Sequence, residues 1–450
     1  MHALRQWSGA RVRAWRPEER DAGLYAASAL FAGLTAHFSG LALYRQWGEL
    51  AVGPYLVAAL ASALVGRHRA RRERLGLEPE PPTGPEALRQ PWRPVRIVIF
   101  LFVLVGATLG PLSLEVAWRA HGNPAAHVQP EDTVINQHAH LLVVGQDPYR
   151  LPVHDGRVVA AVPGQPVYES FFPYLPLMMV FGLPSSAKVP EQLTDPRIFF
   201  SIVTLLVVFG ALAMYRGPTE PRVRTLQVLT VLPTAALPLA TGGDDMPVVA
   251  LLLLAMVLAQ RRRPGWSGFV LGIVSAMKFT AWPLALLALF AARTADGRRA
   301  PGRMALGMLV VGGPVIVPFL LHNPHDFIEN VVLFPLGLAG VASPAASPLP
   351  GHLIVSAFPA LHRLLPITVA AVGGVVLVRH LVRHPPTTTA QACSLAGWIM
   401  TVAILFAPAT RVGYVLYPIN FFVWAHMLRQ ADEVEVPDRL AAAQVSAALD

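Results

Sequence analysis

A long succession of apolar blocks limits the fold of this chain more than any other feature of its sequence. Blocks of about 13 to 24 residues are separated by arginine-rich or proline- and glycine-rich breaks, which fits repeated crossings of a hydrocarbon layer about 30 Å thick. Only 14% of the residues are charged and 54% are hydrophobic, whereas soluble proteins carry about 25% charged residues. The sequence therefore predicts an all-α polytopic integral membrane protein with about twelve transmembrane helices.

The positive charge of the chain is explained by membrane topology. The formal net charge is +9, but the arginines stand in short runs beside the apolar blocks, where they set helix orientation. We therefore expect no nucleic-acid partner, and we expect a multi-pass protein of the plasma membrane with both termini in the cytoplasm. The single cysteine, Cys393, excludes an internal disulfide framework and a cysteine-based metal site.

The breaks between blocks divide the chain into five predicted parts. They are a cytoplasmic tail (1–23), an accessory N-terminal helix pair (24–65), a cytoplasmic arginine- and proline-rich linker (66–95), a transmembrane core (96–428) with a large first external loop (119–197), and a cytoplasmic tail (429–450).

Three local features refine this topology. The polar side chains within residues 44–49 predict a tight turn inside the N-terminal helix pair. The aromatic, proline-rich stretch 171–184 is a poor transmembrane span because interior prolines remove backbone hydrogen bonds, so we expect it to lie in the outer membrane interface. Residues 267–292 predict a hairpin of two short helices with Lys278 close to its outer tip.

Polar residues outside the predicted helices collect on one face of the membrane. They come from the first external loop, from the Gly-Gly-Asp-Asp turn at 242–245, and from the later loops that carry His322 to His352 and Arg411. This distribution predicts a site at the outer membrane surface.

The order and spacing of these motifs resemble a known class of enzyme. Asp132, followed by Gly145-Gln-Asp-Pro-Tyr149 and then Phe172-Pro-Tyr-Leu-Pro176, resembles the first external loop of the GT-C class of membrane glycosyltransferases. More narrowly, the chain resembles glycosyltransferase family 87, the polyprenyl-phosphate-mannose-dependent alpha-mannosyltransferases of actinobacteria. The Gly-Gly-Asp-Asp turn, the block from Gly268 to Lys278 that ends in the letters KFTAWP, and Arg411-Val-Gly-Tyr414 extend the likeness over most of residues 96 to 428. The helix pair before residue 96 and the Gly-Gly-Asp-Asp turn, which replaces a Gly-Asn-x-x-Asp arrangement, depart from the family pattern.

The resemblance implies transfer of a sugar, with mannose expected, from a polyprenyl phosphate to an envelope glycolipid or glycan acceptor outside the membrane. No cofactor is expected, and the partners are the lipid donor, the acceptor and the surrounding membrane lipids. No oligomeric state is indicated. A transporter or flippase of lipid-linked saccharides is the alternative, although such proteins concentrate polar residues near mid-membrane and often contain repeats, which this sequence does not show.

The resemblance also assigns roles to individual residues. Asp132 matches the catalytic aspartate and is assigned as the base, with helix capping as the structural alternative and the adjacent Glu131 as its competitor. Lys278 and Arg411 are candidates to hold the lipid phosphate. The alternatives are that Lys278 reaches the interface without binding substrate and that Arg411 anchors a helix at the headgroups.

The remaining candidates are weaker. The expected substrate contacts include Tyr149 and Tyr414, as well as the histidines His322, His325 and His352. Asp244 and Asp245 are expected to have a structural or substrate-hydroxyl role, with no metal required. Asp147 is expected to be a turn residue. His138 and His140 stand two apart on a predicted helix, which places them on different faces and makes a shared metal improbable.

Overall fold

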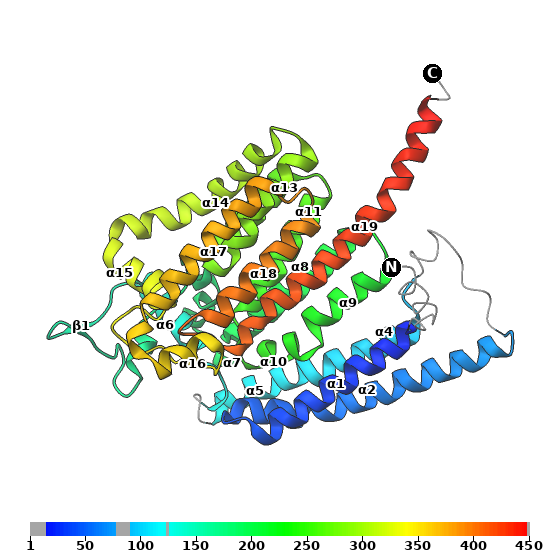
Figure 1. Ribbon diagram of the computed structural model, residues 1–450. Coiled ribbons are helices and arrows are strands. Elements are labelled where there is room, and N and C mark those ends of the chain that lie inside the picture. Colours follow the sequence, from blue (N-terminus) through cyan, green and yellow to red (C-terminus); the bar gives the residue numbers. More distant parts are fainter. Residues whose placement is uncertain (1–14, 78–90, 123–125, 448–450) are drawn as a thin grey trace.

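The computed structural model of the protein describes residues 15–77, 91–122 and 126–447. Long helices run side by side, and the short connecting elements gather at one end of them, the loop end (Figure 1). The opposite end carries most of the arginine-rich turns, among them Arg261 to Arg263 and Arg298 to Arg299. We call this second end the arginine-rich end.

The long helical segments follow one another in the order expected from the apolar blocks. They are α1 (Pro17–Phe38), α2 (Ala42–Arg74), α4 (Pro94–Val103) continued by the π-helical turn η2 (Leu104–Leu109) into α5 (Gly110–His121), α8 (Pro196–Met214), α9 (Thr219–Thr230) followed by α10 (Pro233–Thr241), α11 (Asp245–Gln260), α12 (Pro264–Ser275), α13 (Trp282–Asp296), α14 (Ala300–His322), α17 (Leu364–Arg383), α18 (Thr389–Phe406) and α19 (Leu416–Ala447).

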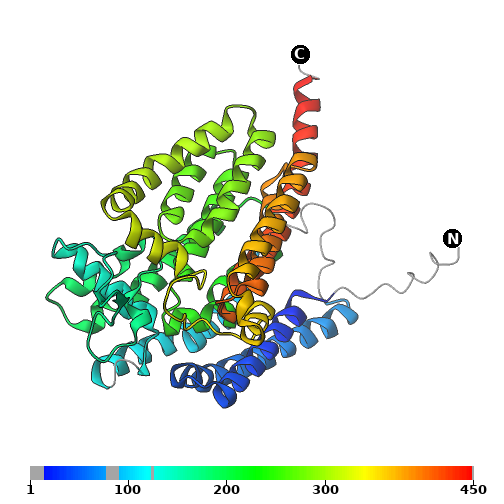
Figure 2. The ribbon, with the colours of Figure 1, turned by 60° about the vertical axis from the view of Figure 1, so that its left-hand side comes forward.

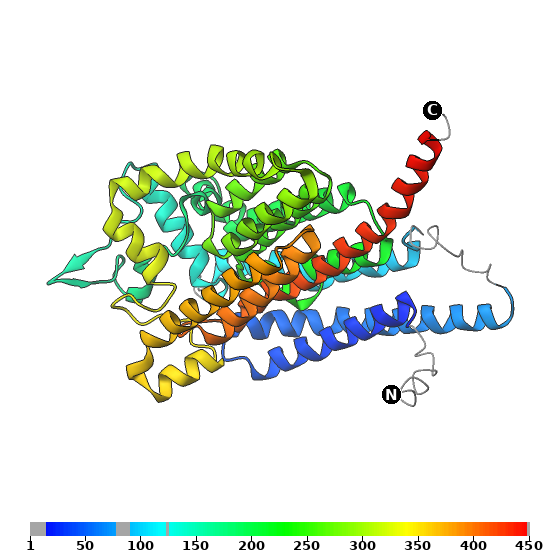
Figure 3. The same ribbon diagram turned by 45° about the horizontal axis from the view of Figure 1, so that its top comes forward.

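The short elements complete the loop end. They are α6 (Pro130–Val143), η4 (Val167–Ser170), η5 (Pro176–Phe181), η6 (Leu183–Ser186), α7 (Glu191–Thr194), η7 (Phe279–Ala281), α15 (Pro324–Ile328), η8 (Glu329–Leu333), α16 (Pro350–Ala357), η9 (Pro359–Leu361) and η10 (Val412–Val415). Strands β1 (Val153–His154) and β2 (Arg157–Val158) form an antiparallel hairpin, which projects from the loop end (Figure 3).

The helical membrane class predicted from composition is confirmed. Within the described residues, 7 helical segments are long and apolar enough to cross a bilayer, and two shorter apolar helices, Asp245–Gln260 and Phe279–Thr294, fall below that length. The segments that meet both conditions include α14, α17 and α18. The predicted number of about twelve crossings therefore exceeds the number that satisfies length and hydropathy together.

Helix α11 forms the centre of the bundle. Nearly all of its side chains are buried, and it packs against α8 and α12. A helix that is apolar on every face is stable where other helices surround it, which explains why this short helix lies inside. By contrast, α17 has no buried residue and α14 very few, so both present most of their surface to the membrane.

The N-terminal helix pair is longer and more tightly joined than predicted. Its turn lies at 39–41, and the residues 44–49 that suggested a turn are inside α2. Their polar character misled the prediction because Trp47 is fully buried and donates its Nε1–H to the carbonyl of Ala107 at 3.0 Å. Figure 2 shows the pair along one flank of the bundle.

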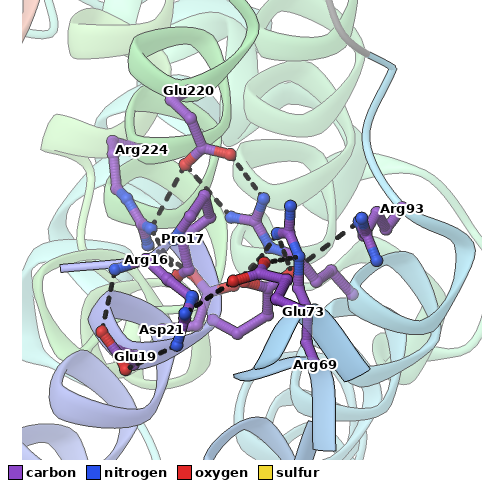
Figure 4. Close-up of polar contacts among 11 residues, drawn as sticks. Arg16, Pro17, Glu19, Asp21, Arg69, Glu73, Arg93, Glu220 and Arg224 are labelled. Carbon is purple, nitrogen blue, oxygen red and sulfur yellow. Dashed lines mark hydrogen bonds and ion pairs between the residues drawn. The ribbon is translucent and has the colours of Figure 1, made fainter. Parts of the chain in front are cut away.

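A network of ion pairs fastens this pair to the bundle (Figure 4). The guanidinium of Arg96 on α4 lies 2.6 Å from the carboxylate of Asp21 on α1 and 2.5 Å from that of Glu220 on α9. Arg224 on α9 also pairs with Asp21. In addition, Arg69 of α2 lies 3.2 Å from Glu18 of α1. Four helices thus meet at these charges, and removing one partner leaves a buried charge uncompensated.

Three predicted boundaries change. Helix α2 extends to Arg74, so the first part of the predicted linker 66–95 is helical, while residues 78–90 of it lie outside the described residues. Helix α19 runs to Ala447, so residues 429–447 of the predicted tail 429–450 continue a helix. Residues 1–14 of the predicted N-terminal tail lie outside the described residues, and α1 begins at Pro17 rather than at 24.

The aromatic, proline-rich stretch forms short turns and no straight transmembrane span, as predicted, and most of its side chains pack inside the protein. Phe172, Leu175 and Met178 are almost inaccessible. The backbone N–H groups of Leu175 and Leu177 donate to the carbonyls of Met277 and Ala276 at 3.0 and 2.9 Å. These bonds satisfy the backbone groups that prolines leave without helical partners, so the stretch packs inside as a short irregular plug.

The contact between α1 and α2 depends on the absence of a side chain at Gly48. A Cβ atom there would lie 2.5 Å from the carbonyl oxygen of Ala32 and 2.6 Å from the nitrogen of Ala36. We therefore expect Gly48→Ala to lower stability by about 1–3 kcal/mol, because backbone atoms must move apart. Thermal unfolding of the detergent-solubilised protein measures this effect.

Gly53→Ala is the matched control for this prediction. Gly53 lies on the same helix, and a Cβ atom there would meet nothing within 4 Å. Alanine also favours a helix over glycine, so Gly53→Ala should leave the unfolding temperature unchanged or raise it. Equal destabilisation by both substitutions would contradict the close contact at Gly48.

Candidate active site at the loop end

Four segments that are distant in the sequence bring charged and aromatic side chains together at the loop end. They are the start of α6, the turn at 242–245 before α11, the tip of the α12–α13 hairpin, and the residues around η10. The predicted hairpin with Lys278 at its tip is present. We call Glu131, Asp244, Asp245, Lys278 and Arg411 the charged cluster.

Lys278 lies at the centre of this cluster. Its Nζ is 3.1 Å from the carboxylate of Asp244 and 2.6 Å from that of Asp245, and its side chain is buried. The Asp245 carboxylate also accepts a hydrogen bond of 2.6 Å from the hydroxyl of Tyr417, which in turn accepts one of 2.7 Å from Thr280. A lysine inside an apolar region is stable only with such partners, so the pairing explains why Lys278 does not turn toward the interface.

Arg411 forms an ion pair with Glu131 of α6, and both side chains are partly buried. The position of Arg411 is set by the loop before it, since the backbone N–H of Thr410 donates to the carbonyl of Ala345 at 2.8 Å. The rings of Tyr174 and Tyr414 are 5.1 and 5.8 Å from Nζ of Lys278. These rings therefore form an aromatic wall beside the ammonium.

Asp132 lies on the other side of the Gly-Gly-Asp-Asp turn. Its carboxyl is fully buried, and neither oxygen has a hydrogen-bond partner among the described residues. It faces Gly242, where a Cβ atom would lie 1.7 Å from Oδ2 and where φ of +110° favours glycine. Burial raises the pKa of Asp132 well above its usual range, and the nearby carboxylate of Asp195 adds to the increase while Arg197 opposes it.

The first turn of α6 thus directs its two acidic residues differently. Glu131 points to Arg411, and Asp132 points to the backbone of Gly242. The carboxyl of Asp132 accepts no hydrogen bond from the backbone of α6, so the helix-capping alternative has no support in this geometry. An acid that is buried without a partner and has a raised pKa is a feature of functional sites.

The start of α6 is held by a contact to the N-terminal pair. Gln129 donates its Nε2–H to the hydroxyl of Tyr44 on α2 at 3.0 Å and to Oγ1 of Thr241 at 2.8 Å. Its backbone N–H donates to the carbonyl of Thr241 at 3.1 Å. The helix pair that departs from the family pattern therefore helps to position the acidic residues.

Tyr149, predicted to contact substrate, is a buried supporting residue. Its hydroxyl donates to the carbonyl of Tyr174 at 2.9 Å, and its ring lies 4.7 Å from that of Phe327. The carboxylate of Asp147 accepts hydrogen bonds from the backbone of Tyr149 and the amide of Asn323 at 2.9 and 3.0 Å, as a turn residue should. Tyr149 thus fixes Tyr174 rather than reaching the charged cluster.

The three loop histidines lie apart from the charged cluster in the described residues. His322 ends α14 and is exposed, and His325 is exposed with its ring 3.0 Å from the carboxylate of Asp326. His352 contacts the carbonyl of Pro408 at 3.1 Å. His138 is buried and His140 exposed, so the two lie on different faces of α6 as predicted. Within the described chain, no group of three or more metal-ligating side chains is present.

Sequence reasoning missed Tyr44 and Tyr174 as parts of the site. Tyr44 was assigned to a turn, and Tyr174 to an interfacial segment. Two signals point to Tyr174: it belongs to the motif Phe172-Pro-Tyr-Leu-Pro176 that carries the resemblance, and it stands between two prolines in a stretch unsuited to a helix, which is typical of an irregular segment packed against other backbone.

The helical fold and the charged cluster at one end define an integral membrane protein with a buried polar site, which in such proteins marks function. The model of glycosyltransferase family 87 matches residues 172–408, more than half of the chain. The protein belongs to this family and is a membrane glycosyltransferase. No curated protein and no solved structure matches the chain. The matched residues include Asp244, Asp245 and Lys278, whereas Asp132 and Arg411 lie outside them.

The pairing of Lys278 predicts a strong effect of removing its charge. We expect Lys278→Met to lower stability by about 3–5 kcal/mol, because it leaves two carboxylates buried without their cation. The triple variant Lys278→Met, Asp244→Asn, Asp245→Asn removes the unpaired charges and should recover much of that loss. Thermal unfolding of both variants tests the prediction, and equal losses would contradict it.

His138 predicts an acid-sensitive fold. Its ring stacks on Phe172 and lies 2.5 Å from the carbonyl of Pro148, and burial lowers its pKa from 6.5 to about 4. Between these values the unfolded chain binds more protons than the folded one. The contribution of His138 to stability is therefore complete above pH 6.5 and decreases as the pH falls toward 4.

Two substitutions on α6 isolate this effect. His138→Phe removes the titrating group, so its unfolding temperature should depend less on pH between 7 and 4.5 than that of the unchanged protein, although its stability at pH 7 is lower. His140→Phe alters an exposed ring and should keep the original pH profile. A pH profile of His138→Phe that runs parallel to the original would exclude this role.

Proposed function

We propose that this glycosyltransferase moves mannose from a polyprenyl-phosphate donor to an envelope glycolipid or glycan acceptor on the outer side of the plasma membrane. The observation that carries the proposal is the pair of cations, Lys278 and Arg411, held beside an acidic helix turn at one end of apolar helices. A lipid phosphate places its charge at the membrane surface, where these cations lie, and arginine binds phosphate oxygens in two-pronged geometry.

The Arg411–Glu131 pair supports a role in donor binding. Arg411 keeps part of its side chain accessible and pairs with a single carboxylate among the described residues. A phosphate offers more acceptor oxygens than a carboxylate, so the donor phosphate can replace Glu131 at the guanidinium. Lys278 is already compensated by two aspartates, so its ammonium would act on the phosphate as a hydrogen-bond donor at short range, and Arg411 would provide the main charge.

The reaction needs one proton acceptor. The acceptor hydroxyl attacks the anomeric carbon, its proton passes to Asp132, and the bond from the anomeric carbon to the phosphate oxygen breaks with its electron pair on the phosphate. Asp132 suits the role better than Glu131 because burial raises its pKa and because, among the described residues, no cation forms a hydrogen bond to its carboxyl oxygens. Arg411 and Lys278 stabilise the leaving phosphate. We propose that no metal or other cofactor takes part.

The proposed orientation follows from the distribution of arginine. The turn after α11, the turn before α14 and the turn after α17 carry Arg261 to Arg263, Arg298 to Arg299 and Arg383. Cytoplasmic loops are enriched in such residues, which supports a cytoplasmic arginine-rich end, cytoplasmic termini and an outward loop end.

The direct test is transfer of labelled mannose from polyprenyl-phosphate mannose into a new product by membranes that contain the protein. We expect Asp132→Asn to lower the rate by about 10²–10⁴-fold, as loss of a general base does. Glu131→Gln should chiefly change the KM for the donor, because it removes the competitor for Arg411. Addition of a chelator should leave the rate unchanged.

Other outcomes redirect the assignment. If Glu131→Gln abolishes transfer and Asp132→Asn retains it at equal abundance, Glu131 is the base. If no protein form transfers mannose while labelled lipid crosses the bilayer, the transporter alternative replaces the enzyme mechanism proposed here.

A further inference from the structure

A second polar site lies at the arginine-rich end, far along the helices from the charged cluster. A hollow of about 650 Å³ is bounded by the end of α17, the start of α18 and the middle of α19. The turn that joins α17 to α18 lies at the opposite end from α6 and β1 (Figure 1). The side chains that matter here are His380, Arg383, His384, Gln391, Trp398 and Arg429.

The charge of this hollow is not compensated. None of its lining residues is acidic, and neither Arg383 nor Arg429 has an ion-pair partner among the described residues. The charge of the ion-pair network between α1, α2, α4 and α9 is compensated, unlike that of the hollow. In that network the guanidinium groups of Arg69, Arg96 and Arg224 pair with carboxylates (Figure 4). Positive charge that converges without an internal partner favours an anionic ligand.

The surrounding backbone adds hydrogen-bond donors. Helix α18 begins here, and the N-terminus of a helix attracts anions. The Oε1 atom of Gln391 accepts from the backbone N–H and the hydroxyl of Thr387 at 2.7 and 3.0 Å. This arrangement orients Gln391 and leaves its amide N–H₂ group able to donate. The rings of His380 and His384 lie 5.8 Å apart and supply further donors when protonated.

The geometry favours the lipid bilayer as the source of the anionic ligand. Helix α17, which forms one wall of the hollow, has no buried residue, so this side of the hollow is open to the membrane. Trp398 lies on the hollow with 61% of its surface exposed. Arg383 is the last residue of α17. Arginine at the end of a transmembrane helix is typical of headgroup depth, and basic pockets between transmembrane helices bind anionic headgroups.

We propose that this hollow binds the phosphate headgroup of an anionic membrane phospholipid, with Arg383 and Arg429 as its principal contacts. The bound headgroup joins the end of α17 to α19. Among the described residues, no ion pair links these two helices. The lipid thus stabilises a helix that otherwise presents its whole surface to the membrane. This site is separate from the one proposed for catalysis, so it does not depend on the donor or the acceptor.

Native mass spectrometry of the detergent-purified full chain tests the proposal. The protein is titrated with phosphatidylglycerol, phosphatidylcholine or inorganic phosphate. We expect retention of phosphatidylglycerol in preference to phosphatidylcholine, and a fall in its affinity of about tenfold or more in the double variant Arg383→Gln, Arg429→Gln, which removes two charge-assisted contacts. Phosphatidylglycerol should also raise the unfolding temperature of the unchanged protein but not that of the variant.

The double variant Arg298→Gln, Arg299→Gln is the matched control, because both residues are exposed at the same end and lie outside the hollow. It should bind phosphatidylglycerol as the unchanged protein does. Equal loss in both double variants would show that general positive charge retains the lipid and would overturn the site. If inorganic phosphate binds as tightly as phosphatidylglycerol, the claim that the ligand comes from the membrane would be overturned. Equal affinity of all forms for both lipids would overturn the proposal entirely.

Discussion

The buried ammonium of Lys278 and its two aspartates form the interaction on which the loop end depends. The ammonium joins the hairpin of α12 and α13 to the start of the central helix α11, and Tyr417 extends the contact to α19. Charges in an apolar surrounding are stable only when they are paired. These helices therefore cannot separate without leaving a charged group unpaired. The same contacts hold the ammonium that we propose to lie near the donor phosphate, so the proposed function would share this set of contacts with the stability of the fold.

The N-terminal helix pair is part of this arrangement. Its ion pairs with α4 and α9 fasten one end. Near the other end, Trp47 donates a hydrogen bond to the carbonyl of Ala107 in η2, and Tyr44 holds Gln129 at the start of α6. The pair lies outside the residues matched by the family model, yet it contacts the turn that carries Glu131 and Asp132. A segment that departs from the family pattern therefore supports the acidic residues proposed for donor binding and catalysis.

The predicted turn at 44–49 rested on local polarity and failed for that reason. These residues lie inside α2, where Trp47 donates a hydrogen bond to Ala107 of η2 and Gly48 packs against the backbone of α1. The prolines of 171–184 correctly indicated that this stretch is not a straight span, but they did not show that its backbone bonds to Ala276 and Met277. The hairpin with Lys278 at its tip was predicted correctly, because a lysine between two apolar runs permits few other arrangements.

The sequence by itself determined the helical membrane class, the order of the helices and the ends at which polar residues collect, because hydrocarbon requires long apolar segments with satisfied backbones. Only the tertiary structure decided which polar residues meet. Glu131 and Asp132 are adjacent in the chain but face different neighbours, Arg411 and Gly242, and Tyr149 supports Tyr174 instead of the charged cluster. Such choices depend on the rotation and depth of packed helices, which periodicity along a single chain does not specify.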